Sequence, residues 1–223
     1  MCGRFTFILP WSEIVRLYRL TLDKDIFRNL GEPRYNIAPT QNVLFVHHGE
    51  NGEQILDEGR WSLVPHWAKE TPKIATFNAR IETADTAPAF RDSFKAKRCL
   101  VAADGFYEWT PSDDGKKDPW HIFLPDHQPF SFAGLWAYNG LLDLRSCTII
   151  TGPAEGAVTQ LHGRMPIILA PEVYDEWLDP KTTKDRAREL LKHNLNRQLQ
   201  FHRVNRDVNS SRFAGKPEPL NPL

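Results

Sequence analysis

The sequence predicts a single α+β domain with a β-rich core and peripheral helices. Short runs of β-branched and aromatic residues recur between turn residues along the chain, and only a few stretches show helical periodicity. The 223 residues contain no internal repeat and no linker long enough to divide them, which fits one domain. Hydrophobic residues make up 41% of the chain and charged residues 25%, as is ordinary for a folded globular protein.

The first elements are expected to be one helix and two strands, separated by loops. Apolar side chains at helical spacing predict a helix over residues 11–20. Residues 31–42 are rich in Pro, Gly and Asn, and residues 61–76 contain two further prolines, so both are expected to be irregular loops. Between them, short strands are expected over residues 43–46 and 53–61.

The middle of the chain is expected to form a helix, a buried strand and a hairpin. Residues 84–97 are predicted to be helical beyond Pro88 and to lead into a buried strand over residues 98–102. Two apolar runs, 105–109 and 120–124, flank a polar turn. This is the pattern of a hairpin with a long connection.

The last part of the chain continues the sheet and adds two helices. Further strands are expected over residues 130–138, 146–151, 167–169 and 201–204. Helical spacing predicts helices over residues 171–178 and 183–194. Because the remaining residues are rich in Asn, Ser and Pro, we expect one domain over residues 1–223 with an irregular tail from about residue 205.

The charge balance excludes some modes of binding. Lys and Arg number 28 and Asp and Glu number 28, so the formal net charge is zero. A protein held to nucleic acid by bulk charge alone is therefore excluded, whereas a local basic groove is not. No apolar run approaches the ~18 residues of a spanning helix, and the first residues lack the order of a secretory signal. We expect a soluble, cytoplasmic protein with no membrane partner.

The three cysteines, Cys2, Cys99 and Cys147, do not form a disulfide framework or a cysteine zinc site. Their number is odd and no CxxC pair is present. The eight histidines show no metal-ligand spacing either. We therefore expect no metal and no organic cofactor. Cys99 and Cys147 lie in apolar predicted strands and are expected to be core residues.

Cys2 is the most informative residue of the sequence. Removal of Met1 would place a free α-amine and a thiol on the same residue, and the amine, with a pKa of about 7.7–8.0, is partly neutral at neutral pH. Such an aminothiol can attack an aldehyde through the amine and close a five-membered thiazolidine with the thiol. It can also attack an amide, as N-terminal-nucleophile hydrolases do. Taken alone, Cys2 favours a bystander cysteine near the chain end over a nucleophile.

Six motifs follow one another from Cys2 to about Asn209. They are Cys2-Gly3-Arg4-Phe5, Arg34-Tyr35-Asn36-Ile37-Ala38-Pro39, Trp61-Ser62-Leu63-Val64-Pro65-His66-Trp67, Asn78-Ala79-Arg80-Ile81-Glu82-Thr83, Asp104-Gly105-Phe106-Tyr107-Glu108-Trp109 and Leu161-His162-Gly163-Arg164-Met165-Pro166. Each motif alone is weakly specific. Together, and in this order, they resemble the SOS-response-associated-peptidase family, also called abasic-site processing proteins.

The resemblance implies a fold and an activity. The fold would have a β-rich, barrel-like core. The protein would bind abasic sites in single-stranded DNA, including sites at single-/double-strand junctions, and crosslink Cys2 to the ring-opened sugar aldehyde through a thiazolidine that shields the lesion. The family's peptidase label refers to removal of the residue before the cysteine, and an AP-lyase side activity is also implied. The protein would act as a monomer, associated with the nucleoid when bound to DNA.

The resemblance also implies three further catalytic residues. Glu108 would be the catalytic carboxylate, because a carboxyl group in an apolar setting can donate and accept protons near neutrality; the alternative is a Glu on the solvent face of a strand. His162 would assist ring closure and reversal and promote β-elimination. Asn78 could orient the sugar or the α-amine through its amide, although a turn-forming Asn is a serious competitor.

The same motifs place candidate DNA-binding residues. Arg4, Arg80 and Arg164 could grip phosphates, and for each the alternative is a surface salt bridge. Thr151 is a further candidate. Pro39 and Trp67 could form an apolar wedge against the bases, or pack on the exposed base pair at a junction.

One segment departs from the family pattern. An Arg commonly follows a few residues after the position of Thr83, but here the chain reads Ala84-Asp85-Thr86-Ala87-Pro88. One phosphate contact is therefore missing or is replaced, with Arg91 as the candidate replacement. Two other functions stay open: an amide hydrolase that uses Cys2 with His162 as base, and a single-strand binder without a covalent step.

Overall fold

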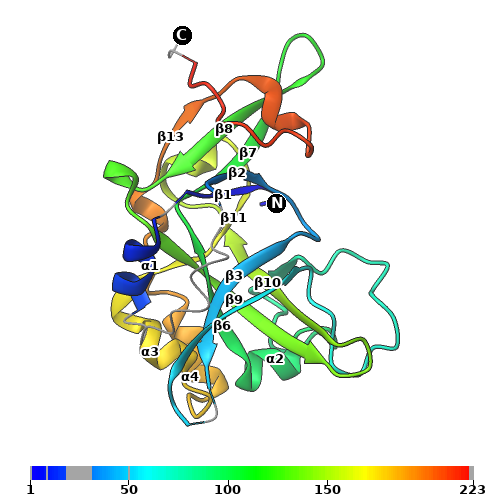
Figure 1. Ribbon diagram of the computed structural model, residues 1–223. Coiled ribbons are helices and arrows are strands. Elements are labelled where there is room, and N and C mark those ends of the chain that lie inside the picture. The colour runs from blue at the N-terminus through cyan, green and yellow to red at the C-terminus, as the bar shows by residue number, and fades with distance from the viewer. Residues whose placement is uncertain (1, 9, 19–31, 50, 221–223) are drawn as a thin grey trace.

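The structure is a computed structural model that describes residues 2–8, 10–18, 32–49 and 51–220 (Figure 1). The α-helices are α1 (Trp11–Tyr18), α2 (Arg91–Ala96), α3 (Tyr174–Leu178) and α4 (Lys184–Leu190). Short 3-10 helices are η2 (Pro125–His127), η3 (Gly156–Gln160), η4 (Pro171–Val173), η5 (Asn196–Gln198) and η6 (Arg206–Asn209).

Thirteen strands are described, and most are short. They are β1 (Phe5–Phe7), β2 (Arg34–Ile37), β3 (Asn42–His48), β4 (Gln54–Trp61), β5 (Asn78–Arg80), β6 (Arg98–Ala103), β7 (Gly105–Pro111), β8 (Lys117–Phe123), β9 (Phe130–Asn139), β10 (Leu144–Pro153), β11 (Arg164–Pro166), β12 (Ile168–Leu169) and β13 (Gln200–Arg203).

The larger sheet closes into a ring. Its strand order is β11-β10-β4-β3-β6-β9-β12, and an additional pairing between β10 and β9 joins the two arms. The pairing of β10 with β4 is parallel, and the other ladders of the ring are antiparallel. The expected barrel-like core and the α+β fold class are therefore confirmed.

The second sheet packs against the ring through aromatic side chains. Its order is β13-β8-β7-β1-β2, and all its pairings are antiparallel. Phe5 on β1 contacts Trp61 at the end of β4, with ring centroids 5.0 Å apart, and Phe132 on β9 at 5.7 Å. Phe106 on β7 also meets the Phe132 ring. Burial of these large rings holds the two sheets together.

Three of the α-helices lie against the ring, away from the second sheet. Figure 1 shows α2, α3 and α4 at the end opposite to β7, β8 and β13. Trp177 of α3 is fully buried, and its indole N–H donates to the backbone O of Cys99 (2.9 Å). Among the described residues, no helix has the length and apolar character needed to cross a membrane.

The prediction of an irregular loop over residues 31–42 is wrong for the central part of this segment. Arg34–Ile37 form β2, and Phe5 of β1 pairs with Ile37. This strand has only four residues and lies at a sheet edge, so neighbouring turn residues hide it in the sequence. The strands β1, β5 and β11 have only three residues each, too few to show an alternating pattern, and the sequence did not predict them. Residues 19, 20 and 31 of the predicted elements lie outside the described residues.

The helix expected over residues 84–97 is shorter than predicted. Turns occupy its first part, and α2 begins only at Arg91. Pro88 cannot donate a backbone hydrogen bond. The buried Asp85 carboxylate binds Lys184 and Arg188 of α4, so the preceding turn is held by tertiary contacts instead.

Candidate active site and DNA interface

Cys2 lies inside the protein, in the apolar cluster between the two sheets. Its side chain is 0% exposed. The thiol donates to the backbone O of Arg4, with Sγ 3.8 Å away. Burial raises the pKa of the Cys2 thiol well above its ordinary value, and the nearby charge of Glu108 raises it further. The sulfur is therefore held as a neutral thiol.

Asn78 touches the same residue from the opposite sheet. It begins β5, where it pairs with Ile149 of β10. Its Nδ2 donates to the backbone O of Cys2 (2.7 Å). The Oδ1 atom of Asn78 is buried and has no hydrogen-bond partner among the described residues. The amide thus orients the backbone of Cys2 and keeps one acceptor available next to it.

Glu108 approaches Cys2 from β7. The backbone N–H of Tyr107 donates to the O of Arg4 (3.0 Å), which lays the first residues of the chain alongside this strand. Glu108 is only 3% exposed. Burial raises the pKa of its carboxyl group, and the charge of His162 acts in the opposite direction. Glu108 can therefore hold a proton at a higher pH than an ordinary Glu.

His162 lies between η3 and β11. Its backbone N–H donates to the O of Val158 (3.1 Å). The ring Nδ1 lies 2.9 Å from both the backbone N and the backbone O of Arg164, which holds the imidazole at the start of β11. Because the charge of His162 acts on Glu108, the structure brings together Cys2, Asn78, Glu108 and His162.

Three of the expected DNA contacts lie on neighbouring strands. Thr151 of β10 pairs with Arg80 of β5 on one side and with Pro166 of β11 on the other. The Arg80 side chain is exposed. Thr151 is 0% exposed, and its backbone O accepts from Arg164 Nη2 (2.8 Å). A phosphate contact by the Thr151 side chain stays a prediction.

Arg164 already has an anionic partner. Its guanidinium donates to both carboxylate oxygens of Glu82, over 2.7 Å and 2.9 Å. This hydrogen bonding holds the pKa of Glu82 below its usual range. Glu82 was not assigned a role from the sequence, although it lies in the same motif as Arg80. The sequence did contain a sign that Glu82 could pair with an arginine of the site: it is a carboxylate two residues after Arg80, which is expected to bind phosphate.

The remaining candidates lie at other points of the surface. Arg4 is partly buried, and burial lowers its pKa. Pro39 lies in the turn after β2, where Thr40 has a φ of 75° and its N–H donates to Trp61 O (2.8 Å). This turn therefore abuts the segment that leads to Trp67, a residue that is 54% exposed.

The part of the chain that the structure describes has no group of three or more His, Cys, Asp or Glu residues that could hold a metal ion. Cys99 and Cys147 are fully buried in β6 and β10, as predicted. The suggested replacement contact, Arg91, lies on α2 with its Nε 3.7 Å from Asp92. Its role stays a prediction.

Comparisons with known proteins find both sequence relatives and a structural neighbour. A family model described as SOS response associated peptidase (SRAP) matches residues 1–211. The chain is 40% identical over 219 residues to a Bacillus subtilis protein named abasic site processing protein YoaM, covering 94% of this chain and 93% of that protein. It is 32% identical over 225 residues to abasic site processing protein YedK of Escherichia coli, with 96% and 97% covered. A solved structure of a Bacteroides thetaiotaomicron protein has the same fold, with a TM-score of 0.79 at 23% identity over 94% of this chain and 95% of that one.

Proposed function

The chain belongs to the SOS response associated peptidase family, and from this premise we propose that it captures abasic sites in single-stranded DNA through a covalent bond to Cys2. One observation carries the proposal. The buried Cys2 thiol lies in the field of a buried carboxyl group, Glu108, while Asn78 holds the Cys2 carbonyl at 2.7 Å. A cysteine with only a structural role needs neither neighbour.

The reaction begins with removal of Met1. In the full chain the nitrogen of Cys2 is part of a peptide bond and is not nucleophilic. In an autocatalytic peptidase step, the Cys2 thiol attacks the Met1 carbonyl carbon, which moves the Met1 acyl group from nitrogen to sulfur and frees the amine. Water then hydrolyses this thioester, which releases methionine and restores the thiol. The amine nitrogen then adds to the aldehyde carbon of the ring-opened abasic sugar and forms a carbinolamine.

Glu108 supplies the proton that the next step needs. The carbinolamine loses its hydroxyl group as water, which requires a proton and leaves a protonated imine. The donor is the carboxyl group of Glu108, whose pKa is raised by burial. The Cys2 sulfur then adds to the imine carbon, closes the thiazolidine and returns its proton to the Glu108 carboxylate. The net products are the thiazolidine and one water molecule.

His162 has a separate role in this scheme. Its imidazole takes up a proton during reversal of the ring and can promote β-elimination, the AP-lyase side reaction. Arg4, Arg80 and Arg164 bind phosphates, and Pro39 and Trp67 contact bases, at single-stranded sites and at junctions with a duplex. No metal or organic cofactor takes part. The protein acts as a monomer in the cytoplasm and is associated with the nucleoid when bound to DNA.

Intact-mass analysis tests the proposal. Protein verified to begin at Cys2 is mixed with an oligonucleotide that carries one abasic site and, separately, with the undamaged oligonucleotide. The expected result is an adduct with the abasic strand only, at the summed mass less one water. Binding of both strands without an adduct would instead indicate a non-covalent binder. Hydrolysis of an added amide without an adduct would indicate an amidohydrolase.

A further inference from the structure

The strand that carries Glu108 loses one of its partners near this residue. The pairing of β1 with β7 ends at Phe106, with one further bond from the Tyr107 N–H to Arg4 O. Beyond this point, the described ladder of β7 continues with β8 alone, through Pro111. On the other side of β8, β13 extends the sheet only as far as Trp120, the partner of Glu108. Beyond Glu108, β7 and β8 form a two-stranded ribbon, which is marginally stable by itself. The position of Glu108 therefore depends on what packs against the hairpin.

The C-terminal segment packs there, on the outer face of the second sheet. Figure 1 shows η6 beside the projecting end of the β7–β8 hairpin. Tyr107, Val204 and Val208 form a small buried cluster. Trp109 and Phe213 pack against it from the side. Because side chains alternate along a strand, Tyr107 and Trp109 face this segment, whereas Glu108 faces Cys2.

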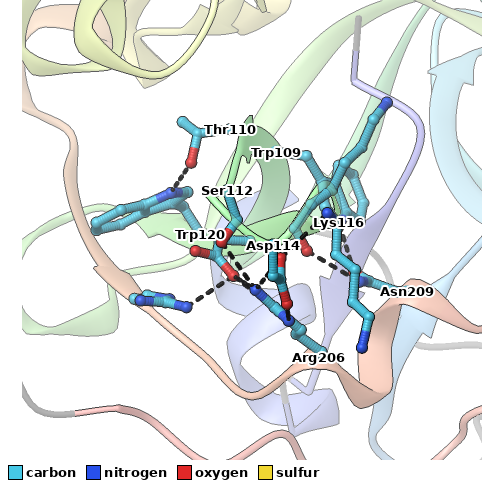
Figure 2. A network of polar contacts seen from close by, with 11 residues as sticks. Trp109, Thr110, Ser112, Asp114, Lys116, Trp120, Arg206 and Asn209 are labelled. Carbon is cyan, nitrogen blue, oxygen red and sulfur yellow. Dashed lines mark hydrogen bonds and ion pairs between the residues drawn. The ribbon is translucent and has the colours of Figure 1, made fainter.

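Asn209 joins both strands of the hairpin (Figure 2). Its Oδ1 accepts the indole N–H of Trp109 (2.6 Å), and its Nδ2 donates to the backbone O of Lys117 (3.0 Å). Trp109 directly follows Glu108 in the chain, and Lys117 begins β8. One side chain thus ties the residue next to Glu108 to the opposite strand.

Arg206 binds the part of the hairpin that lies nearer its turn. Its Nε donates to Asp118 (2.8 Å), and its Nη atoms donate to Asp114 and to Ser112 Oγ (3.0 Å). Arg203 adds an ion pair to Asp118 at 2.7 Å. These contacts hold the turn and the start of β8, so the segment braces the hairpin along its length.

We propose that Asn209, supported by Arg206, is a positioning residue that holds Glu108 against Cys2. The inference rests on the proposed function, because it concerns the carboxyl group of that reaction. Asn209 touches neither Cys2 nor the DNA in this account. It acts by fixing the outward-facing neighbour of Glu108, and a displacement of about 1 Å at a reacting group can cost up to ~10²-fold in rate.

The test is a double-mutant cycle on the rate of adduct formation at saturating DNA. Asn209→Ala should slow the reaction by about 10- to 100-fold, with DNA affinity unchanged. In a Glu108→Ala background, the same substitution should have no further effect, since the group that it positions is absent. An equal slowing in both backgrounds would overturn the proposal, and so would the absence of any slowing.

A second variant removes the same hydrogen bond from its other end. Trp109→Phe keeps a ring but loses the indole donor, so it should slow the reaction as Asn209→Ala does. The double variant should be no slower than either single variant, and additive losses would contradict the inference. Trp109→Phe also serves if Asn209→Ala fails to fold.

The matched control is Arg186→Ala, which removes an exposed bidentate pair with Glu176 on the helical side of the molecule. It should leave the rate unchanged. If the wild-type protein forms no adduct, the proposed function fails. If the wild type forms the adduct and Glu108→Ala slows it, but Asn209→Ala does not, only the positioning role fails.

Discussion

The interior of the site and its rim are built in opposite ways. In the interior, Cys2 and Glu108 are almost fully buried, and the charge of Glu108 adds to burial in raising the pKa of the Cys2 thiol. On the rim, Arg80 is exposed and Trp67 is 54% exposed, whereas Arg164 is engaged by Glu82. A buried reactive pair is fixed by packing, so its geometry exists before DNA arrives. Exposed rim groups depend on the ligand to order them.

This difference separates reaction from binding. Substitutions in the interior should change the rate of adduct formation and leave non-covalent affinity intact. Substitutions on the rim should change affinity and its salt dependence and leave the rate at saturation intact.

The largest effect is expected from Glu108→Ala. Loss of the proton donor should slow adduct formation by ~10²–10⁴-fold, with unchanged affinity for undamaged single-stranded DNA. The wild-type rate should fall as the pH rises through the raised pKa of Glu108, because the protonated form is the donor. This pH-dependent limb should be absent in the variant. Samples quenched at successive times and run on denaturing gels, over a pH range of about 5 to 9, measure the rate of adduct formation and its pH dependence.

Glu108→Gln controls for folding. A carboxyl group whose pKa is raised in the folded state costs stability once the pH exceeds that pKa. The neutral amide should therefore keep or increase the melting temperature at alkaline pH, while adduct formation stays slow. A variant that forms the adduct at the wild-type rate would remove Glu108 from the reaction.

Trp67→Ala gives an intermediate effect on the rim. If the exposed indole stacks on a base, the loss should be ~1–3 kcal/mol of binding free energy per base. The melting temperature should hardly change, since a side chain that is 54% exposed contributes little to the core. Fluorescence anisotropy and thermal unfolding measure the two quantities. A large fall in melting temperature with intact affinity would make Trp67 a structural residue.

The smallest effects separate the two rim arginines. Arg80→Ala should flatten the dependence of log K on log salt by about 0.7, the value for one phosphate contact on a single strand. Glu82→Gln should act in the opposite direction, because it releases the guanidinium of Arg164 for phosphate. Its stability cost should be small, since an exposed ion pair is worth about 0–1 kcal/mol. Equal slopes in both variants and the wild type would place these residues outside the DNA path.

The fold was predictable where the hydrophobic pattern is long. The strands over residues 98–102 and 146–151 are rich in apolar and β-branched residues and are found as β6 and β10. The short edge strand β2 was not predictable, because turn residues surround it and its partner is distant in the sequence, with Ile37 pairing with Phe5 of β1. Likewise, the network that holds Asp85 to α4 depends on tertiary contacts that no local pattern shows.

The site shows the same division. The family motifs singled out Cys2 and Glu108 as candidates, and both side chains are buried in the structure. Sequence alone did not show that Glu82 occupies Arg164 or that Asn209 reaches Trp109, a pair 100 residues apart. Such contacts arise only when distant strands and the C-terminal segment are folded together.

The N-terminus provides the most direct test of covalent capture. Two preparations, verified by N-terminal mass, are compared on the same abasic oligonucleotide: one begins at Cys2 and the other retains Met1. The account predicts a heat-stable adduct from the first only, because the amine of Cys2 is blocked by the peptide bond in the second, and a thiol alone adds to an aldehyde reversibly. A heat-stable adduct whose mass shows that the protein still carries Met1 would contradict the thiazolidine mechanism and place the nucleophile elsewhere in the chain.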